Sequence, residues 1–542
     1  MTTLKGGSQT FDLSPGEVLI VSAIGEGSVG HVSLDSAAGA VPAVSATVTA
    51  GTSQTIGPFA VACSIKVYSV GRCSVTRDSG VVSGGGNFGR RLALIGDSRH
   101  ANGYLVSTPS AVSVAGSVAS VTSTNVGLSV AVGDQITLGK CTGCTYIRAT
   151  VATIADNDNI TANINFPIAG LPSGAIRNSS SVLVLRGTRR PTYPTTFAAW
   201  LLMLLGQPFE TVDCYAFNGA RSDEVLDGQI PDALGIGFDS VWLFDTVNDY
   251  MSSGDNKSAD YCIAKYKDIV SRVGGRAVWL FLEPPLSGAT YDTAANRSRI
   301  QAINAWARTA GVRVVDFYSA LDDGSGAAKA GWLFDGLHTG LKGSLGGALA
   351  TYQMMGLPVY HRAATAIGAG SNRFPLANPT FSGILGASQM PTGYSRSTQG
   401  LITETGYGLQ AKADGTGNEW YADMVTTGAA QYMFRSAGTP VTAGVKYRVR
   451  FRIQIIGMVG LEYMEITLRN QTGDASIGGL MTNNSSSLQL IGDADGTYAI
   501  SGEQDLVIPA GVTSAYYRPR LYFDGAGGGR VVYSDVTFEA VT

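Results

Sequence analysis

The chain is poor in charge, histidine and cysteine, and it has no long apolar run. Charged residues make up 15% of its 542 residues and the formal net charge is −3, so no basic surface for nucleic acid is expected. No run of about eighteen apolar residues exists that could span a bilayer. Residues 1–7 lack the features of a Sec signal, which predicts folding in a cytoplasm. These absences favour a globular protein that neither inserts into a membrane nor binds nucleic acid.

Six cysteines are too few for a disulfide framework in a chain of this length. Cys141 and Cys144 have the spacing of redox or zinc sites, but no second such pair exists, so incidental thiols are the favoured interpretation. Cys63 and Cys73 fall on neighbouring predicted strands and could approach each other. The sequence leaves that pairing open.

The chain is too long for one core, and its patterns predict several regions. Short alternating strands with glycine-containing turns fill residues 1–86, which predicts an all-β module. Strands alternating with helices over residues 87–367 predict a three-layer α/β/α sandwich with a parallel sheet. Within it, residues from about 105 to 187 return to period two and predict an inserted β subdomain. Residues 368–542 lack helical patterns and predict a jelly-roll-like β-sandwich.

A candidate nucleophile follows a short apolar run. Residues 92–96 predict a buried parallel strand, and Asp97 and Ser98 come next in a tight turn. The Ser98 hydroxyl should therefore stand at the carboxyl edge of the sheet, where α/β enzymes place reactive groups. A serine nucleophile needs a base and a group that orients the base. Asp335 precedes His338 by three residues on a loop late in the α/β region, a spacing that suits this arrangement.

Four blocks occur in the order typical of the SGNH (GDSL-type) hydrolases, over residues from about 90 to 365: Gly96-Asp97-Ser98, Asn218-Gly219, Asn248-Asp249 and Asp335-x-x-His338. The chain resembles this family, and the resemblance implies a serine esterase without metal or organic cofactor. Ser98 would be the nucleophile, His338 the general base and acid, and Asp335 the residue that orients His338. The resemblance also implies that the backbone amides of Ser98 and Gly219 and the side-chain amide of Asn248 bind the oxyanion.

The first and third blocks have features that the resemblance leaves open. Thr246 stands where the family usually has glycine, so the backbone near Asn248 is expected to be set differently. The long insertion after the first block is expected to form a wall of the substrate cleft. Asp97 is expected to brace the turn. Arg99 and His100 could contact an anionic substrate or be surface residues, and surface residues are favoured.

Aromatic and basic residues of the last region each have two possible roles. Four aromatic residues could stack on sugar rings or pack in the core or between subunits, which is favoured: Tyr407, Trp420, Tyr421 and Tyr432. A row of arginines could bind acidic glycans, although a solvated strand face is favoured: Arg448, Arg450 and Arg452.

An esterase domain flanked by β modules resembles a bacteriophage tailspike or tail-fibre protein that de-esterifies host polysaccharide. Residues 16–21 and 55–59 resemble the short β domains that begin many phage tail proteins. This resemblance implies a homotrimer in the virion that binds other tail proteins and acts on host O-antigen or capsule. The predicted function is therefore removal of acetyl groups from that polysaccharide. The alternatives are a bacterial carbohydrate esterase or lipase outside any phage, and a non-catalytic glycan-binding adhesin.

Overall fold

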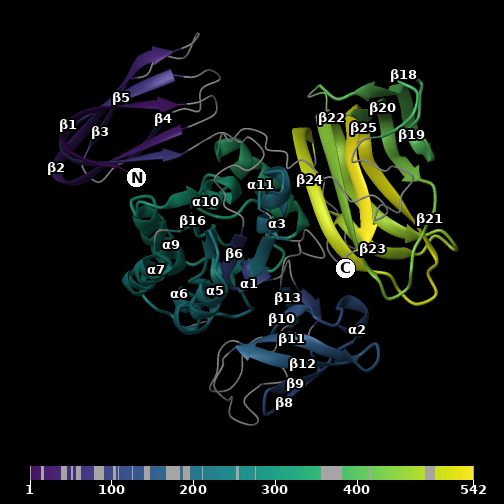
Figure 1. The fold of residues 1–542 in the computed structure, drawn as a ribbon, viewed down its shortest axis with the longest axis horizontal. Helices are drawn as coiled ribbons and strands as arrows, with labels where there is room; N and C mark the ends of the chain where they lie inside the picture. The colour runs from purple at the N-terminus through teal and green to yellow at the C-terminus, as the bar shows by residue number, and fades with distance from the viewer. Residues whose placement is uncertain are drawn as a thin grey trace.

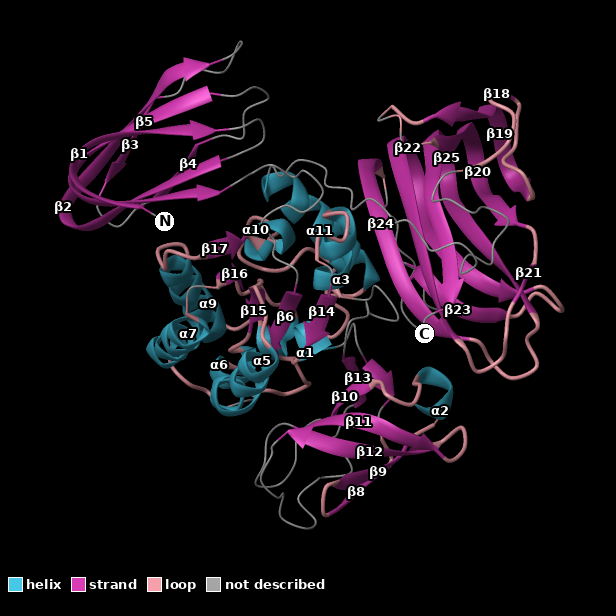
Figure 2. Cartoon of the chain, in the orientation of Figure 1, coloured by secondary structure: helices cyan, strands magenta, loops and turns pink. Residues whose placement is uncertain are grey.

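The computed structural model groups the strands of the described residues into four sheets (Figure 1). It describes residues 2–13, 18–37, 45–49, 53–56, 63–78, 91–101, 105–107, 109–124, 126–138, 147–166, 183–186, 196–209, 211–251, 255–274, 276–355, 381–413, 415, 417–482 and 495–540. Helices gather around one sheet, while the other three regions consist almost wholly of strands (Figure 2). None of the helices in the described part of the chain is long and apolar enough to cross a bilayer.

The sheet that carries the helices is parallel and has the strand order β14-β6-β15-β16-β17. Its strands are β6 (Arg91–Gly96), β14 (Thr211–Cys214), β15 (Ser240–Phe244), β16 (Ala277–Phe281) and β17 (Arg313–Val315). The strands are apolar on both sides, as expected of a parallel sheet covered by helices. In β6, Leu92 and Leu94 join one buried cluster, whereas Ala93 and Ile95 join another. The two clusters lie on opposite faces because successive side chains alternate.

Helices cover both faces of the parallel sheet. One cluster includes residues of α3 (Phe197–Leu204), α10 (Phe317–Leu321) and α11 (Leu341–Met355). The other cluster includes residues of the π-helical turn η2 (Val225–Gln229), α5 (Ile230–Ile236), α7 (Ala259–Val273) and α9 (Ala294–Ala307). The short helices of the described region are α1 (Ser98–Ala101), α4 (Ser222–Glu224), α6 (Val247–Tyr250) and α8 (Gly288–Tyr291). The α/β region is therefore layered helix, sheet, helix.

Helix α7 shows how the sequence pattern produces one of these layers. Its buried residues Cys262, Tyr266, Ile269 and Val273 recur at helical spacing and form one apolar face. The Ser258 hydroxyl caps the helix start by accepting a hydrogen bond from the Tyr261 amide. At the other end, Gly274 has a φ of 67°, which favours glycine and ends the helix.

A seven-stranded antiparallel sheet is inserted after α1. Its strands are β7 (Leu105–Ser107), β8 (Ala111–Ala115), β9 (Val118–Thr122), β10 (Gln135–Leu138), β11 (Ile147–Ile154), β12 (Asn159–Phe166) and β13 (Leu183–Arg186), with α2 (Val126–Ser129) between β9 and β10. Arg148 of β11 forms an ion pair with the buried carboxylate of Asp232 in α5, at 2.9 Å. This pair joins the inserted sheet to the helical layer.

The amino-terminal strands form a separate five-stranded sheet. They are β1 (Thr2–Leu13), β2 (Val18–Ala37), β3 (Ser45–Thr49), β4 (Ser53–Ile56) and β5 (Cys63–Asp78). Cys63 and Cys73 lie near the start and the end of β5, so the expectation that they occupy neighbouring strands is wrong. Cys141 and Cys144 lie outside the described residues.

The carboxyl-terminal strands are connected by pairing into one antiparallel sheet of eight strands, and the jelly-roll-like arrangement stays a prediction. They are β18 (Gly386–Ala387), β19 (Tyr394–Ala411), β20 (Asn418–Ser436), β21 (Thr439–Pro440), β22 (Lys446–Asn470), β23 (Ser476–Thr482), β24 (Gly496–Val507) and β25 (Ser514–Ala540). Strands β22 and β25 pair along most of their length, with several register shifts. Such shifts bend and twist a strand, so long strands can curve without breaking the sheet.

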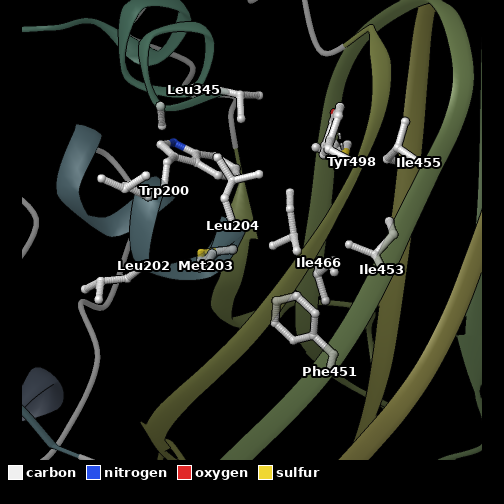
Figure 3. Packing of buried hydrophobic residues seen from close by; sticks show 14 of the residues in the cluster. Trp200, Leu202, Met203, Leu204, Leu345, Phe451, Ile453, Ile455, Ile466 and Tyr498 are labelled. Carbon is white, nitrogen blue, oxygen red and sulfur yellow. Dashed lines mark hydrogen bonds between the residues drawn. The ribbon is translucent and has the colours of Figure 1, made fainter. Parts of the chain in front are cut away.

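The α/β region and the carboxyl-terminal sheet share one buried apolar cluster (Figure 3). Trp200 and Met203 of α3 lie on one side of it, and Phe451 and Ile466 of β22 and Tyr498 of β24 lie on the other (Figure 3). Such burial is worth roughly 25 cal/mol per Å² of apolar surface removed from water. The two regions are therefore held together by continuous hydrophobic packing.

Candidate active site

The turn that carries Ser98 is held on both sides by neighbouring backbone and side chains. Gly96 ends β6 with a φ of 139°, and a Cβ atom there would lie 1.8 Å from the Phe244 carbonyl oxygen of β15. Only glycine allows so close an approach. The buried side chain of Gln229 donates to the Gly96 carbonyl and accepts from its amide, each at 2.8 Å. Ser98 therefore begins α1 from a rigid support.

The structure brings Ser98, His338 and Asp335 together although 240 positions separate the serine from the histidine. Ser98 Oγ lies 2.6 Å from His338 Nε2, and His338 Nδ1 lies 2.7 Å from Asp335 Oδ2. Asp335 Oδ1 also accepts hydrogen bonds from the backbone amides of Leu337 and His338. The three side chains thus form the hydrogen-bonded order of nucleophile, base and orienting acid.

The carboxyl group of Asp335 is kept ionised by its donors. Partial burial opposes the charge, but the hydrogen bonds from the His338 ring and backbone outweigh it and lower the pKa of Asp335 to about 2. At neutral pH this carboxylate can therefore hold the Nδ1 proton of His338, which leaves Nε2 free to accept a proton from Ser98.

Gly219 and Asn248 lie in the segments that follow the two strands beside β6. The turn after β14 carries Gly219, and the short helix α6 after β15 carries Asn248. Asn248 Nδ2 donates to the Ala220 carbonyl at 2.8 Å, and Asp249 accepts from the amide and hydroxyl of Ser222. These bonds tie the two segments together at the carboxyl edge of the sheet that carries Ser98. Oxyanion binding by Gly219 and Asn248 stays a prediction.

Thr246 adopts the left-handed backbone conformation that favours glycine, with φ 78° and ψ −17°. The sequence suggested that a threonine in place of glycine would change the backbone near Asn248. The structure does not support this expectation, because Thr246 adopts a conformation typical of glycine. A non-glycine residue held there costs on the order of 1–3 kcal/mol. Buried hydrogen bonds offset this cost, since Thr246 Oγ1 donates to Glu283 at 3.0 Å.

Arg99 is neither a surface residue nor exposed to a substrate, so both interpretations of it are wrong. Its side chain is 4% exposed and its guanidinium lies against the Phe244 ring. It donates to the carboxylates of Asp97 and Glu283 and to the Asp245 carbonyl. Asp97 also accepts from the Arg99 amide at 2.9 Å, so Asp97 braces the turn as expected. The positive charge of Arg99 is therefore neutralised inside the protein by these carboxylates, next to Ser98 in the chain.

His100 is also buried, between the rings of Phe244 and Phe281. Burial and the neighbouring positive charge of Arg99 lower its pKa to about 3. The imidazole is therefore neutral at physiological pH and serves as part of the core.

Glu283 is the residue of this site that sequence reasoning missed. It is fully buried, and its carboxylate accepts from Arg99, Thr246, Tyr250 and Tyr266. Its backbone amide and carbonyl pair with the Asn304 side chain. A signal was present, because an acid directly after an apolar strand and before two prolines is unusual for a solvent loop. We name the buried group of Asp97, Arg99, Thr246 and Glu283 the charge cluster.

The predicted sugar-stacking aromatics do not share one exposed face. Trp420 and Tyr432 are fully buried and their rings stack on each other, so the packing interpretation holds for both. Tyr407 is partly buried and packs against the same apolar cluster. Neighbouring strand positions alternate between faces, so Tyr421 points to the opposite side from Trp420, where Arg530 covers its ring.

The row of arginines on β22 is not a freely solvated face. The guanidinium of Arg450 donates to Glu503 of β24 at 2.8 Å, and Arg448 pairs with the same carboxylate at 3.7 Å. Both arginine side chains are mostly buried. The described contacts therefore make Arg448 and Arg450 cross-strand partners.

Residues 179–344 match the GDSL-like lipase/acylhydrolase family model. This match begins at residue 179, just before β13 of the inserted sheet, and so does not include Ser98. No curated protein matches the chain.

Solved structures resemble parts of the chain. A putative GDSL-like lipase from Parabacteroides merdae is 18% identical, over 30% of this chain and 83% of that one, with a TM-score of 0.27. A structure of carbohydrate-binding modules from the β-sandwich superfamily is 12% identical, over 27% of this chain and 56% of that one, with a TM-score of 0.20. The enzymatically active domain of bacteriophage CBA120 tailspike protein 4 is 12% identical, over 28% of this chain and 20% of that one, with a TM-score of 0.20.

The chain thus spans about half of the carbohydrate-binding structure and a fifth of the tailspike domain. All three TM-scores are low, so we base no functional inference on these structures. The family match covers His338 and Asp335, and the fold supplies Ser98 at hydrogen-bond distance from His338. Over residues 179–344 the α/β region is therefore similar to the GDSL-like lipase/acylhydrolase family.

Proposed function

We propose that this protein is a serine esterase that removes acetyl groups from a bacterial surface polysaccharide. The observation that carries the proposal is the 2.6 Å contact between Ser98 Oγ and His338 Nε2, with Asp335 on the other ring nitrogen. A serine hydroxyl is a weak nucleophile unless an adjacent base accepts its proton. This contact provides that base.

The reaction proceeds in two steps. Ser98 Oγ attacks the ester carbonyl while His338 Nε2 takes the hydroxyl proton, and His338 then donates this proton to the departing alcohol oxygen. Water next attacks the acyl-serine bond, giving its proton to His338, and His338 returns it to Ser98 as acetic acid leaves. Asp335 holds Nδ1 throughout and stabilises the positively charged imidazole.

The negative charge on the carbonyl oxygen needs donors in both steps. We assign this role to the backbone amides of Ser98 and Gly219 and to the side-chain amide of Asn248. The bond from Asn248 to the Ala220 carbonyl supports the assignment, because it orients one amide hydrogen and leaves the other for the substrate. Loss of one such donor typically lowers the rate by about 10²-fold or more.

The polysaccharide substrate and the phage context rest on the organisation of the chain. An esterase region lies between an amino-terminal β-sheet and a long carboxyl-terminal β-sheet, as in the tail proteins that the sequence resembles. The protein would then form a homotrimer in the phage tail, bind other tail proteins and act on O-antigen or capsule at the host surface.

The test is a panel of O-acetylated and chemically deacetylated bacterial polysaccharides, with released acetate measured by NMR. We expect acetate from at least one acetylated polymer, together with covalent labelling of Ser98 by a serine-reactive phosphonate. Binding to a polymer without acetate release or labelling would indicate a non-catalytic adhesin. Turnover of lipid or plant esters alone would indicate an esterase outside any phage. Light scattering of the full chain tests the trimer.

The carboxylate of Asp335 predicts a specific pH dependence. Its pKa of about 2 lies below the ordinary value for aspartate of about 3.9. The contribution of this carboxylate to the free energy of unfolding is therefore complete above about pH 4 and is lost as the pH falls through about 2.

We expect Asp335→Asn to lower kcat/KM by about 10³- to 10⁴-fold at every pH from 5 to 9, because the amide no longer fixes the imidazole.

Rates of p-nitrophenyl acetate hydrolysis across this pH range check that prediction. Asp316→Asn is the matched control, since Asp316 caps α10 away from His338. A variant Asp335→Asn with the wild-type rate at neutral pH would show that the carboxylate does not orient His338.

A further inference from the structure

An exposed aromatic ring stands beside the proposed catalytic histidine. Phe334 is 56% exposed, and its ring stacks on the His338 imidazole with centroids 5.8 Å apart and planes 22° apart. Among the described residues of the α/β region, no other aromatic side chain is so exposed. A single exposed ring is common on a protein surface, but one that lies against a catalytic side chain is placed where a ligand can contact it.

The backbone holds this ring in one place. The Phe334 amide donates to the His338 carbonyl at 3.0 Å, and Leu333 forms an antiparallel bridge with Thr339. Between them, Gly336 turns with a φ of 89° and packs closely on Ser287, whose amide donates to the Gly336 carbonyl. The loop from 333 to 339 is thus a closed turn that presents Phe334 and His338 side by side.

The position of Phe334 also decides which half of an ester it can contact. His338 Nε2 must reach the oxygen of the departing alcohol in order to protonate it. A ring packed against the His338 imidazole is therefore a candidate contact for the alcohol half of the ester. One isolated ring suits a compact flat group, because a long hydrocarbon chain would need an extended apolar surface.

We propose that Phe334 is a binding platform for the pyranose ring that carries the ester. In this proposal the C–H groups of the sugar pack against the exposed part of the Phe334 ring next to the imidazole, so that the acylated oxygen lies toward His338 Nε2. This inference rests on the proposed function, and it assigns the alcohol subsite of that reaction to a residue that the family blocks do not contain.

The test compares esters that share the acetyl group and differ in the alcohol. Initial rates are measured with per-acetylated methyl glucopyranoside and with ethyl acetate, for the full-length wild type, Phe334→Ala and Phe334→Trp. We expect Phe334→Ala to lower kcat/KM for the sugar ester roughly fivefold to tenfold, mainly through KM, as for loss of one aromatic contact. The loss on ethyl acetate should be clearly smaller than the loss on the sugar ester, and Phe334→Trp should retain the sugar preference.

Three other outcomes would contradict the proposal that Phe334 binds the sugar ring. Equal losses on both esters would mean that Phe334 only positions His338. A loss that follows acyl length, measured with p-nitrophenyl acetate and hexanoate, would place Phe334 on the acyl side. A change in mass by light scattering on Phe334→Ala would mean that the ring packs against another subunit. Ile384→Ala is the matched control, since Ile384 is an exposed apolar residue outside the α/β region.

A binding measurement separates this proposal from the esterase itself. In Ser98→Ala, which cannot turn over the ester, saturation-transfer NMR should detect the ring protons of the acetylated sugar. That signal should vanish when Phe334→Ala is added. Persistence of the signal in the double variant would contradict the role of Phe334 as a binding platform. Absence of any ester hydrolysis by the wild type would contradict only the proposed function.

Discussion

Ser98→Ala is expected to lower kcat/KM for acetyl esters by about 10⁴- to 10⁶-fold. The large effect follows from the geometry, because Ser98 Oγ is the atom that His338 contacts at 2.6 Å and the atom that forms the acyl bond. Binding should change little, since the alanine removes only one oxygen from a side chain that is mostly buried. The residual rate comes from water attacking within the remaining amide donors.

The measurement is acetate release under saturating ester, together with mass spectrometry of the protein after exposure to a serine-reactive phosphonate. Ser325→Ala is the matched control, because Ser325 is an exposed loop serine of the same region. It should retain both activity and labelling at Ser98. Equal acetate release by wild type and Ser98→Ala would show that the contact to His338 is structural.

Arg99→Met is expected to lower the free energy of unfolding of the α/β region by about 3–5 kcal/mol. The guanidinium neutralises Asp97 and Glu283, and both of these residues are fully buried. Methionine keeps much of the volume but leaves two carboxylates without their counter-charge. Removal of one partner from a buried ion pair costs far more than the pair itself contributes, because the remaining charge stays out of water.

Urea unfolding followed by tryptophan fluorescence measures this loss, since every tryptophan except Trp420 lies in the α/β region. Arg308→Met is the control: Arg308 pairs with Asp316 on the surface, and such pairs contribute about 1 kcal/mol or less. Arg99→Lys should fall between the two, because lysine keeps the charge but cannot donate to both carboxylates with one planar group. An unchanged midpoint in Arg99→Met would mean that the charge cluster does not stabilise the fold.

Local sequence predicted Ser98, His338 and Asp335 because each lies in a short pattern with its own structural meaning. Residues 92–95 form an uninterrupted apolar run, which predicts a strand buried on both faces, and their side chains do alternate between two buried clusters. Asp335 and His338 interact across three residues, a contact that spacing within one loop can anticipate.

The charge cluster could not be predicted in the same way, because its members are distant along the chain. Asp97 is only two residues from Arg99, but Glu283 is 184 positions away, and nothing near Arg99 indicates that this second carboxylate is its partner. A charged residue without a visible partner is normally exposed, which is why the sequence favoured the surface. Thr246 is similar, since its left-handed conformation is tolerated through its bond to the same carboxylate.

What the sequence by itself determined is therefore local: which segments are strands and helices, where the polar loops begin, and which loops carry a nucleophile and a base. Only the tertiary structure decided which side chains meet, including the burial of Arg99 and the stacking of Phe334 on His338. It also decided that the carboxyl-terminal strands join in one connected sheet. The physical reason is that periodicity reports the environment of a residue, whereas long-range pairing depends on how whole elements pack in three dimensions.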